Sequence, residues 1–346
     1  MIYVFVVCSS FLISLFKNKK NSKFIVYILV VFLGLFAGTR IVGIDNDSNF
    51  YKYLFEDIVY RNEKWELEFL SSLIPVILSW FTQSYVQWSF VAFALISLSL
   101  KFISIKDFKY FSLAILLYST NLFFLQDFTT IRAAIASGIL LYSIRYLYPM
   151  DNKRFFMCVV MSTLFHLSSI IFITIWLVLR YRISLKVLFY SLLLSLIIPL
   201  INLNLIILLR LDLVFSKAAS YLIIQEQEDS TLNLFSFKIL IALVMLFILI
   251  RFRDLIKYKY FDILLKIHML SLIFFFVFSG TGLTFSIRTF ELLSIVQILL
   301  YPLIINVFPQ RLSLIPYLLI FGISFICLYY NIFFSDTIKD YQSWLI

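Results

Sequence analysis

Long apolar runs recur along nearly the whole chain, and short charged segments separate them; examples are Ile2–Phe16, Tyr85–Leu100 and Ser313–Phe333. The 346 residues are 62% hydrophobic and 14% charged, with a mean hydropathy of +1.00. A soluble domain of this length cannot hide so much apolar surface. The pattern therefore predicts a membrane protein with many spans. Alternating ten-residue strands are absent, which favours helices.

The basic residues predict how the spans are oriented. Cytoplasmic loops carry an excess of lysine and arginine, and the first apolar run is followed at once by Lys17, Lys19, Lys20 and Lys23. We therefore expect this side to be cytoplasmic and the N-terminus to be outside. Continued along the chain, the pattern predicts an all-α, polytopic protein with about 11–12 transmembrane helices, some re-entrant or broken, and a C-terminus that is also outside. In this topology Tyr85–Leu100 runs inward to a cytoplasmic loop that contains Lys101, Lys106 and Lys109.

A single transmembrane domain, residues 1–346, accounts for the chain, because the sequence shows no linker or soluble domain. Two large extracytoplasmic segments are expected at 41–84 and 202–233, and both carry acidic side chains. In the first, Leu67–Phe81 is apolar but interrupted by Pro75, so we expect a re-entrant or interfacial helix there. The net charge of +10 is explained by basic cytoplasmic loops, and no nucleic-acid partner is expected.

The stretch Phe155–Leu179 fits either one long span or a hairpin of two short helices with His166 at its outer tip. A hairpin puts 19 of the 29 basic residues inside, and a single span puts 15 there. The positive-inside rule prefers the hairpin. Its two arms would be short for a membrane core of ~30 Å, and such broken helices are tolerated where they line a cavity. A cavity at His166 is therefore expected.

Three arginines mark the outer ends of predicted spans, and a histidine lies on the same side. They are Arg40, Arg132, Arg288 and His166. An arginine in the membrane costs about 2.5–3.5 kcal/mol at the centre and less near the ends. Its guanidinium fork suits bidentate binding of phosphate or carboxylate. Four such residues at one depth indicate a site for a lipid-linked diphosphate, and the small residues after Arg132 favour close helix packing there.

Each of these residues also has an ordinary interpretation. Arg40 and Arg132 fit interfacial side chains that snorkel to water. His166 fits a hydrogen-bonded core histidine. Arg288 lies three residues before Glu291, a helical spacing at which two opposite charges neutralise each other.

Metal and nucleotide chemistry are not expected. Only two histidines are present, and Cys8, Cys158 and Cys327 lie in apolar runs, which disfavours a zinc site or a disulfide. Asp45 and Asp47 match a D-x-D spacing, but two carboxylates in a loop fit turn formation equally well. No Walker A loop is present, so ATP is not the energy source. We therefore expect no cofactor.

Four segments together resemble the EpsG family and related Wzy-type polymerases of bacterial surface polysaccharides. They are R-I-V-G-I-D-N-D-S-N-F-Y (Arg40–Tyr51), I-R-A-A-I-A-S-G-I (Ile131–Ile139), L-F-H-L-S-S-I-I (Leu164–Ile171) and S-I-R-T-F-E (Ser286–Glu291). Their order and spacing agree with the family along nearly the whole chain. Ala133 is a departure, because many relatives have glutamine after the arginine.

The resemblance implies a GT-C-like glycosyltransferase of the bacterial cytoplasmic (inner) membrane. Such an enzyme transfers a growing glycan from undecaprenyl diphosphate to the non-reducing end of a lipid-linked repeat unit, on the outer face of the membrane and without metal. The expected partners are the lipid-linked oligosaccharide, the bilayer and a protein that regulates chain length.

The resemblance also suggests roles for the site residues. The leaving diphosphate would be bound by the three arginines, Arg40, Arg132 and Arg288. The acceptor hydroxyl would lose its proton to His166 or Asp45, and Glu291 would hold Arg288.

Two other functions remain open from the sequence. A flippase for the same lipid-linked oligosaccharide would also need basic residues, but they would line a continuous path and would tend to accompany repeat symmetry. An O-antigen ligase would use similar chemistry with a different acceptor.

Overall fold

The computed structural model describes residues 1–60, 68–201, 203–204, 208, 233–234, 236–281, 283–334 and 338–345. Within these ranges it is helical, with two isolated β-bridges and no β-strand, so the all-α prediction is confirmed there. The chain divides into two compact units. Unit 1 comprises Met1–Ile173 and Tyr301–Ile346, and unit 2 comprises Thr174–Leu300.

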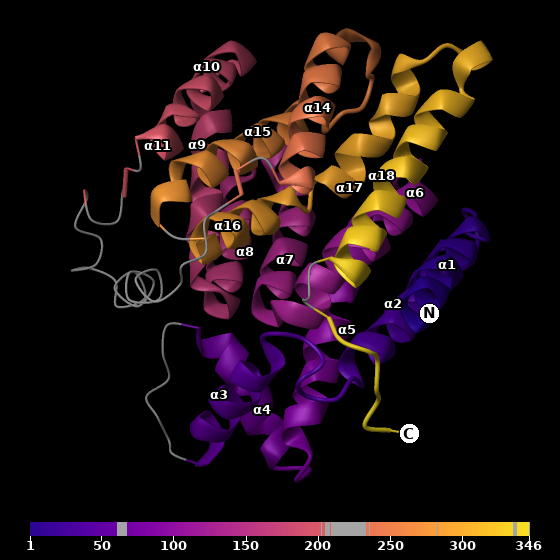
Figure 1. Ribbon diagram of the computed structural model, residues 1–346, viewed down its shortest axis with the longest axis vertical. Helices are drawn as coiled ribbons and strands as arrows, with labels where there is room; N and C mark the ends of the chain where they lie inside the picture. The colour runs from indigo at the N-terminus through magenta and orange to yellow at the C-terminus, as the bar shows by residue number, and fades with distance from the viewer. Residues whose placement is uncertain are drawn as a thin grey trace. The chain divides into compact units, whose positions relative to one another are not determined.

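Unit 1 holds most of the chain. Its helices are α1 (Ile2–Leu15), α2 (Ser22–Gly38), α3 (Ser48–Tyr60), α4 (Phe69–Ser79), α5 (Tyr85–Ile105), α6 (Phe111–Leu117), the π-helical η1 (Tyr118–Thr129), α7 (Ile131–Leu147), α8 (Asn152–Phe165), η2 (Leu167–Ile171), η6 (Tyr301–Val307), η7 (Gln310–Leu312) and α18 (Leu314–Phe333). The short helices α3 and α4 lie together at one end of the unit, against α5 (Figure 1).

Unit 2 is built on α15. Its helices are α10 (Leu185–Ser195), α11 (Ile197–Leu200), α14 (Phe237–Arg251), η4 (Arg253–Leu255), α15 (Phe261–Val277), η5 (Ser279–Thr281), α16 (Leu283–Ser294) and α17 (Gln297–Leu300). α9 (Phe172–Arg180) contains the division between the units. In α15, His268 is fully buried and its Nε2 lies 3.1 Å from the carbonyl oxygen of Ala242.

The helices are those of a membrane protein. Three stretches are long and apolar enough to cross a membrane: Tyr85–Ile105, Phe111–Thr129 and Gln310–Phe333. A fourth is counted if the bent pair Phe285–Ser294 and Gln297–Val307 forms one span. The other apolar helices in the described ranges are shorter, so the number of 11–12 spans stays a prediction.

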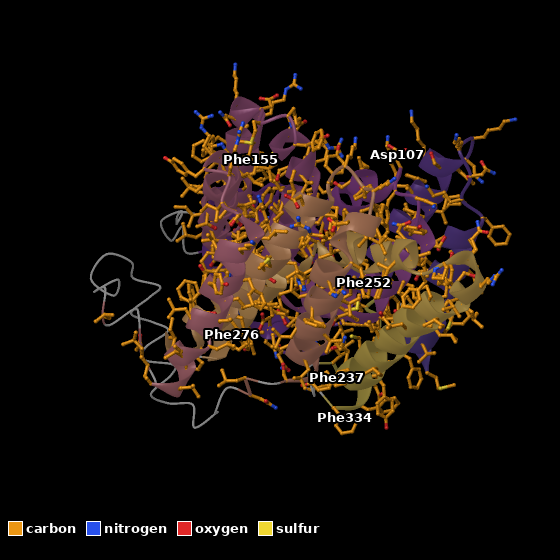
Figure 2. All side chains as sticks on the ribbon, turned by 90° about the horizontal axis from the view of Figure 1, so that it is seen from above. Asp107, Phe155, Phe237, Phe252, Phe276 and Phe334 are labelled. Carbon is orange, nitrogen blue, oxygen red and sulfur yellow. The ribbon has the colours of Figure 1, made fainter. Side chains whose placement is uncertain are left out.

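Small residues let α2 and α7 pack closely against the same neighbour, α5. A Cβ added to Gly34 would lie 2.5 Å from Leu95, and one added to Gly138 would lie 3.1 Å from Leu100. The small-residue run after Arg132 therefore serves helix packing in α7. Side chains fill the space between the helices; Phe155, labelled in Figure 2, is 1% exposed.

Three of the predicted segments can be compared with the helices of the structure. Phe155–Leu179 is not one continuous helix, because α8 ends at Phe165 and His166 has an extended backbone. The segment 41–84 contains α3 and α4, and α4 includes Pro75. The segment 202–233 lies outside the described residues except at 203–204, 208 and 233.

One predicted helix boundary is wrong. Lys101 was expected in a cytoplasmic loop, but it lies inside α5 and is fully buried. A buried carboxylate explains this, because Lys101 Nζ lies 3.1 Å from Asp127 Oδ2.

Candidate functional site

Glu68 brings together two residues that the sequence singled out. One of its carboxylate oxygens pairs with Arg132 Nη1, and the other lies 3.6 Å from His166 Nδ1. The side chains of Arg132, His166 and Glu68 are 15%, 12% and 5% exposed, so the group is shielded but reachable. We call Glu68, Arg132 and His166 the polar cluster. Its members come from the starts of α4 and α7 and from the end of α8.

Local structure explains why Glu68 is held there. Arg132 lies in the first turn of α7, where its charge faces the positive end of the helix dipole. The negative charge of the Glu68 carboxylate offsets both the charge of Arg132 and the positive end of the α7 dipole. It also accepts a hydrogen bond of 3.0 Å from the backbone N–H of Leu167, just after the break at His166. A carboxylate at this position therefore ties α7 to the α8–η2 corner.

Aromatic rings of α3 cover the Arg132 guanidinium. Its Cζ lies 5.3 Å from the ring centre of Tyr51 and 5.9 Å from that of Phe50. Such rings attract the cation without occupying its N–H groups. Arg132 is thus positioned by a carboxylate and two rings.

Arg40 and Asp45 form a different kind of site, a buried ion pair. Arg40 Nε donates to Asp45 Oδ2 at 2.8 Å, and the two side chains are 1% and 0% exposed. The other Arg40 nitrogens donate to the carbonyl oxygens of Ala37 and Phe128. The guanidinium fork is therefore occupied by the protein.

Asp45 also organises the loop before α3. Its Oδ1 accepts from the backbone N–H of Ser48 at 2.9 Å and of Asp47 at 3.2 Å. Gly43 has φ +97°, a conformation that favours glycine. Asp45 thus performs the turn-forming role that the sequence left open, beside its ion pair with Arg40.

A chain of rings connects the two arginines. The Arg40 Cζ lies 4.7 Å from the ring centre of Phe90, and Phe90 packs edge-on against Tyr51 at 6.4 Å. Tyr51 in turn faces Arg132. Phe90 and Tyr51 are buried, so the position of α3 depends on Arg40 and helps to set that of Arg132.

The C-terminal tail, residues 338–345, is hydrogen-bonded to the loop that contains Arg40. The backbone N–H of Ile41 donates to Gln342 at 3.0 Å, that of Lys339 to Ile44 at 2.8 Å, and that of Trp344 to Thr39 at 3.0 Å. The Tyr341 ring stacks on Phe36 at 4.3 Å. Figure 1 shows the yellow tail beside the end of α2.

Arg288 and Glu291 lie one helical turn apart in α16 of unit 2, and both are half-buried. The ion pair between them stays a prediction, as does their participation in a site with the residues of unit 1. Among the described residues, no three His, Cys, Asp or Glu side chains form a group suited to a metal ion. Cys8, Cys158 and Cys327 form no disulfide with one another.

Sequence reasoning missed two features. Glu68 is one of several acidic residues in the loop that is predicted to lie outside, and only its position directly before an apolar helix distinguishes it. The second is a fully buried triad in which Lys101 contacts Asp127 and, at 3.0 Å, the hydroxyl of Tyr118. Tyr118 also donates to Asp127. In the sequence, only the positions of Lys101 and Asp127 at the edges of apolar runs could have indicated this triad.

The comparisons with known proteins agree with this picture. The sequence model of the EpsG family matches residues 23–344, which is nearly the whole chain and includes every residue of the polar cluster. No curated protein and no solved structure matches the chain. The chain therefore belongs to the EpsG family, a family of Wzy-like polysaccharide polymerases.

Proposed function

We propose that this protein elongates a surface polysaccharide by transferring the growing glycan from undecaprenyl diphosphate to the non-reducing end of a lipid-linked repeat unit. The observation that carries the proposal is Glu68, whose carboxylate is shared between an arginine suited to bind diphosphate and a histidine suited to accept a proton. Family membership supports the polymerase class. The donor, the acceptor and the roles below belong to the proposal.

In the proposed reaction, Arg132 binds the diphosphate of the donor. The bond between the sugar C1 and the diphosphate oxygen breaks, and negative charge grows on the leaving group. Arg132 stabilises this charge most strongly in the transition state, as catalysis requires. Phosphate oxygens compete with Glu68 for the same guanidinium. Diphosphate binding therefore weakens the pair between Glu68 and Arg132 and lets the Glu68 carboxylate move closer to His166.

His166 takes the proton of the acceptor hydroxyl as its oxygen bonds to C1. In this proposal Nε2 acts as the base, and Nδ1 faces Glu68. The Glu68 carboxylate orients the ring and stabilises the imidazolium that forms, as in other carboxylate–histidine pairs. The separation of 3.6 Å is longer than a hydrogen bond, and such contacts often tighten only when substrate binds. Asp45 is disfavoured as the base because Arg40 and two backbone N–H groups already hold it.

The other predicted residues take supporting roles in this proposal. Arg40 and Asp45 position the loop and α3, and thereby Tyr51 over Arg132. The roles of Arg288 in binding diphosphate and of Glu291 in holding Arg288 stay predictions from the sequence. The reaction proceeds without metal, on the outer face of the bacterial cytoplasmic membrane, with both termini on that side and with a chain-length regulator as a protein partner.

A gel of surface polysaccharide tests the proposal. Cells without the protein are complemented with wild type, Arg132→Ala, His166→Ala, or the control Lys153→Ala, whose side chain is exposed at the start of α8. We expect a single repeat unit in the null, a ladder with wild type and control, and no ladder with the two cluster variants. A full ladder from both cluster variants at normal protein level would contradict the site. Loss of all surface glycan in the null, with lipid-linked units accumulating inside, would indicate a transporter.

A further inference from the structure

An apolar furrow runs along α7 in unit 1. It has a volume of about 870 Å³ and is lined by residues of α5, α7 and α8. Both α5 and α8 pack on α7. Ile139 and Tyr142 of α7 form the floor, with Ser99 of α5 and Cys158 and Met161 of α8 on the two sides. Its size is in the usual range of small-molecule sites, roughly 300–1,000 Å³.

One end of the furrow reaches the polar cluster. Phe165 lines the furrow and directly precedes His166. Ile139, on the floor, lies about two helical turns along α7 from Arg132. α4, which begins immediately after Glu68, packs against both α5 and α8. The apolar surface therefore begins where the charged groups end.

The far end of the furrow is polar again. Arg154 and Tyr146 line it there, with the Arg154 Cζ 5.8 Å from the Tyr146 ring centre. From Phe165 to Arg154, α8 rises by about 17 Å at 1.5 Å per residue. The furrow is thus an apolar channel of limited length between two polar ends.

We propose that this furrow binds the diphosphate-proximal isoprene units of the lipid-linked substrate. This inference rests on the proposed function, because it assigns the diphosphate to Arg132. In such a lipid the charged head is joined to one end of the apolar tail. In the protein, Arg132 likewise lies near one end of the apolar furrow. Flexible Met157 and Met161 suit a methyl-branched chain of irregular outline. An ordinary phospholipid acyl chain is the competing occupant.

Photolabelling identifies the occupant without relying on activity. The full-length protein in vesicles is irradiated with a polyprenyl diphosphate that carries a diazirine on its second isoprene unit, or with a phosphatidylglycerol that carries a diazirine in its acyl chain. We expect the prenyl probe to label the α8 peptide that contains Met157–Met161, and unlabelled polyprenyl diphosphate to abolish the label. Equal labelling by the phospholipid probe, with no competition by polyprenyl diphosphate, would overturn the assignment.

Substitutions that fill the furrow give a second test. Cys158→Phe and Ser99→Phe add a ring from opposite sides, whereas Val160→Phe adds the same ring on an exposed position of α8 that does not line the furrow. Two donors with the same glycan are compared: one has a full polyprenyl tail, and the other, the short donor, carries a methyl group on its diphosphate in place of the tail. We expect the furrow variants to raise KM for the long donor by on the order of tenfold, the equivalent of about two buried methylene groups. KM for the short donor should not change in the furrow variants, and Val160→Phe should not change KM for either donor.

The outcomes separate this inference from the proposed function. If the furrow variants and Val160→Phe have the same KM for both donors as wild type, the furrow does not bind the tail, although polymerase activity stands. If wild type elongates neither donor, the proposed function fails, and the photolabelling result alone decides whether the furrow binds a prenyl chain.

Discussion

The Glu68 carboxylate lies 3.6 Å from the Nδ1 of His166, although the two residues come from separate elements, the start of α4 and the end of α8. The contact forms because the helix breaks at His166 and because the N–H of Leu167 binds the same carboxylate oxygen. Glu68 therefore connects a break in one helix to the cation at the start of another. Two predictions test the consequences of this arrangement, and two more test the buried ion pairs of unit 1.

Glu68→Gln keeps the shape of the side chain and removes its charge. We expect the rate of polymer formation to fall by about 10²-fold, because His166 loses the group that stabilises its imidazolium. The matched control is Glu56→Gln on α3, whose carboxylate lies 4.0 Å from Lys52 and is 36% exposed. The measurement is the initial rate in membranes with equal amounts of protein. Equal rates for the two variants would contradict the role of Glu68.

Arg132→Lys keeps the charge and removes the planar fork. We expect weaker inhibition by added inorganic pyrophosphate and a lower rate, because an ammonium does not bind diphosphate in a bidentate way. Arg180→Lys, at an exposed site at the end of α9, should leave both quantities unchanged. An unchanged inhibition constant in Arg132→Lys would show that Arg132 does not contact the diphosphate.

The Arg40–Asp45 pair should behave as a structural pair. Removing one partner leaves a buried charge and should lower the free energy of unfolding by about 3–5 kcal/mol, whereas Arg40→Met with Asp45→Leu should recover part of that loss. Thermal unfolding of the four proteins in one detergent measures this cycle. A fully stable Arg40→Met protein without activity would instead place Arg40 at the diphosphate.

The buried triad of α5 and η1 should follow the same rule. Lys101→Met and Asp127→Asn should each destabilise the protein by about 3–5 kcal/mol, and the double variant by less than their sum. Lys106→Met, near the end of α5 and half-buried, is the control. Additive losses from Lys101 and Asp127 would mean that the two charges do not interact in the folded protein.

The sequence predicted the helical membrane fold because composition alone decides that class. It also selected Arg132 and His166, because charged residues are rare in apolar runs. It did not select Glu68, since acidic residues are common in outer loops and only the folded α4 brings this one to Arg132. It misplaced Lys101, because the positive-inside rule cannot distinguish a loop lysine from one that is paired with Asp127 in the interior.

The C-terminal tail and the loop of Arg40 show the same limit. Pairing between Ile41 and Gln342 joins segments from opposite ends of the chain, and neither segment is long enough to show a strand pattern. Asp45 carried two interpretations in the sequence, and the geometry supports the structural one through Ser48 and Arg40.

A double-mutant cycle between Glu68 and His166 tests the central claim most directly. Wild type, Glu68→Gln, His166→Ala and the double variant are reconstituted in vesicles with one lipid-linked repeat unit, and the initial rate of elongation is measured. If Glu68 acts through His166, the double variant is no slower than His166→Ala, because residues that act as a unit are not additive. If the two losses multiply, Glu68 and His166 act independently, and the proposed mechanism is wrong.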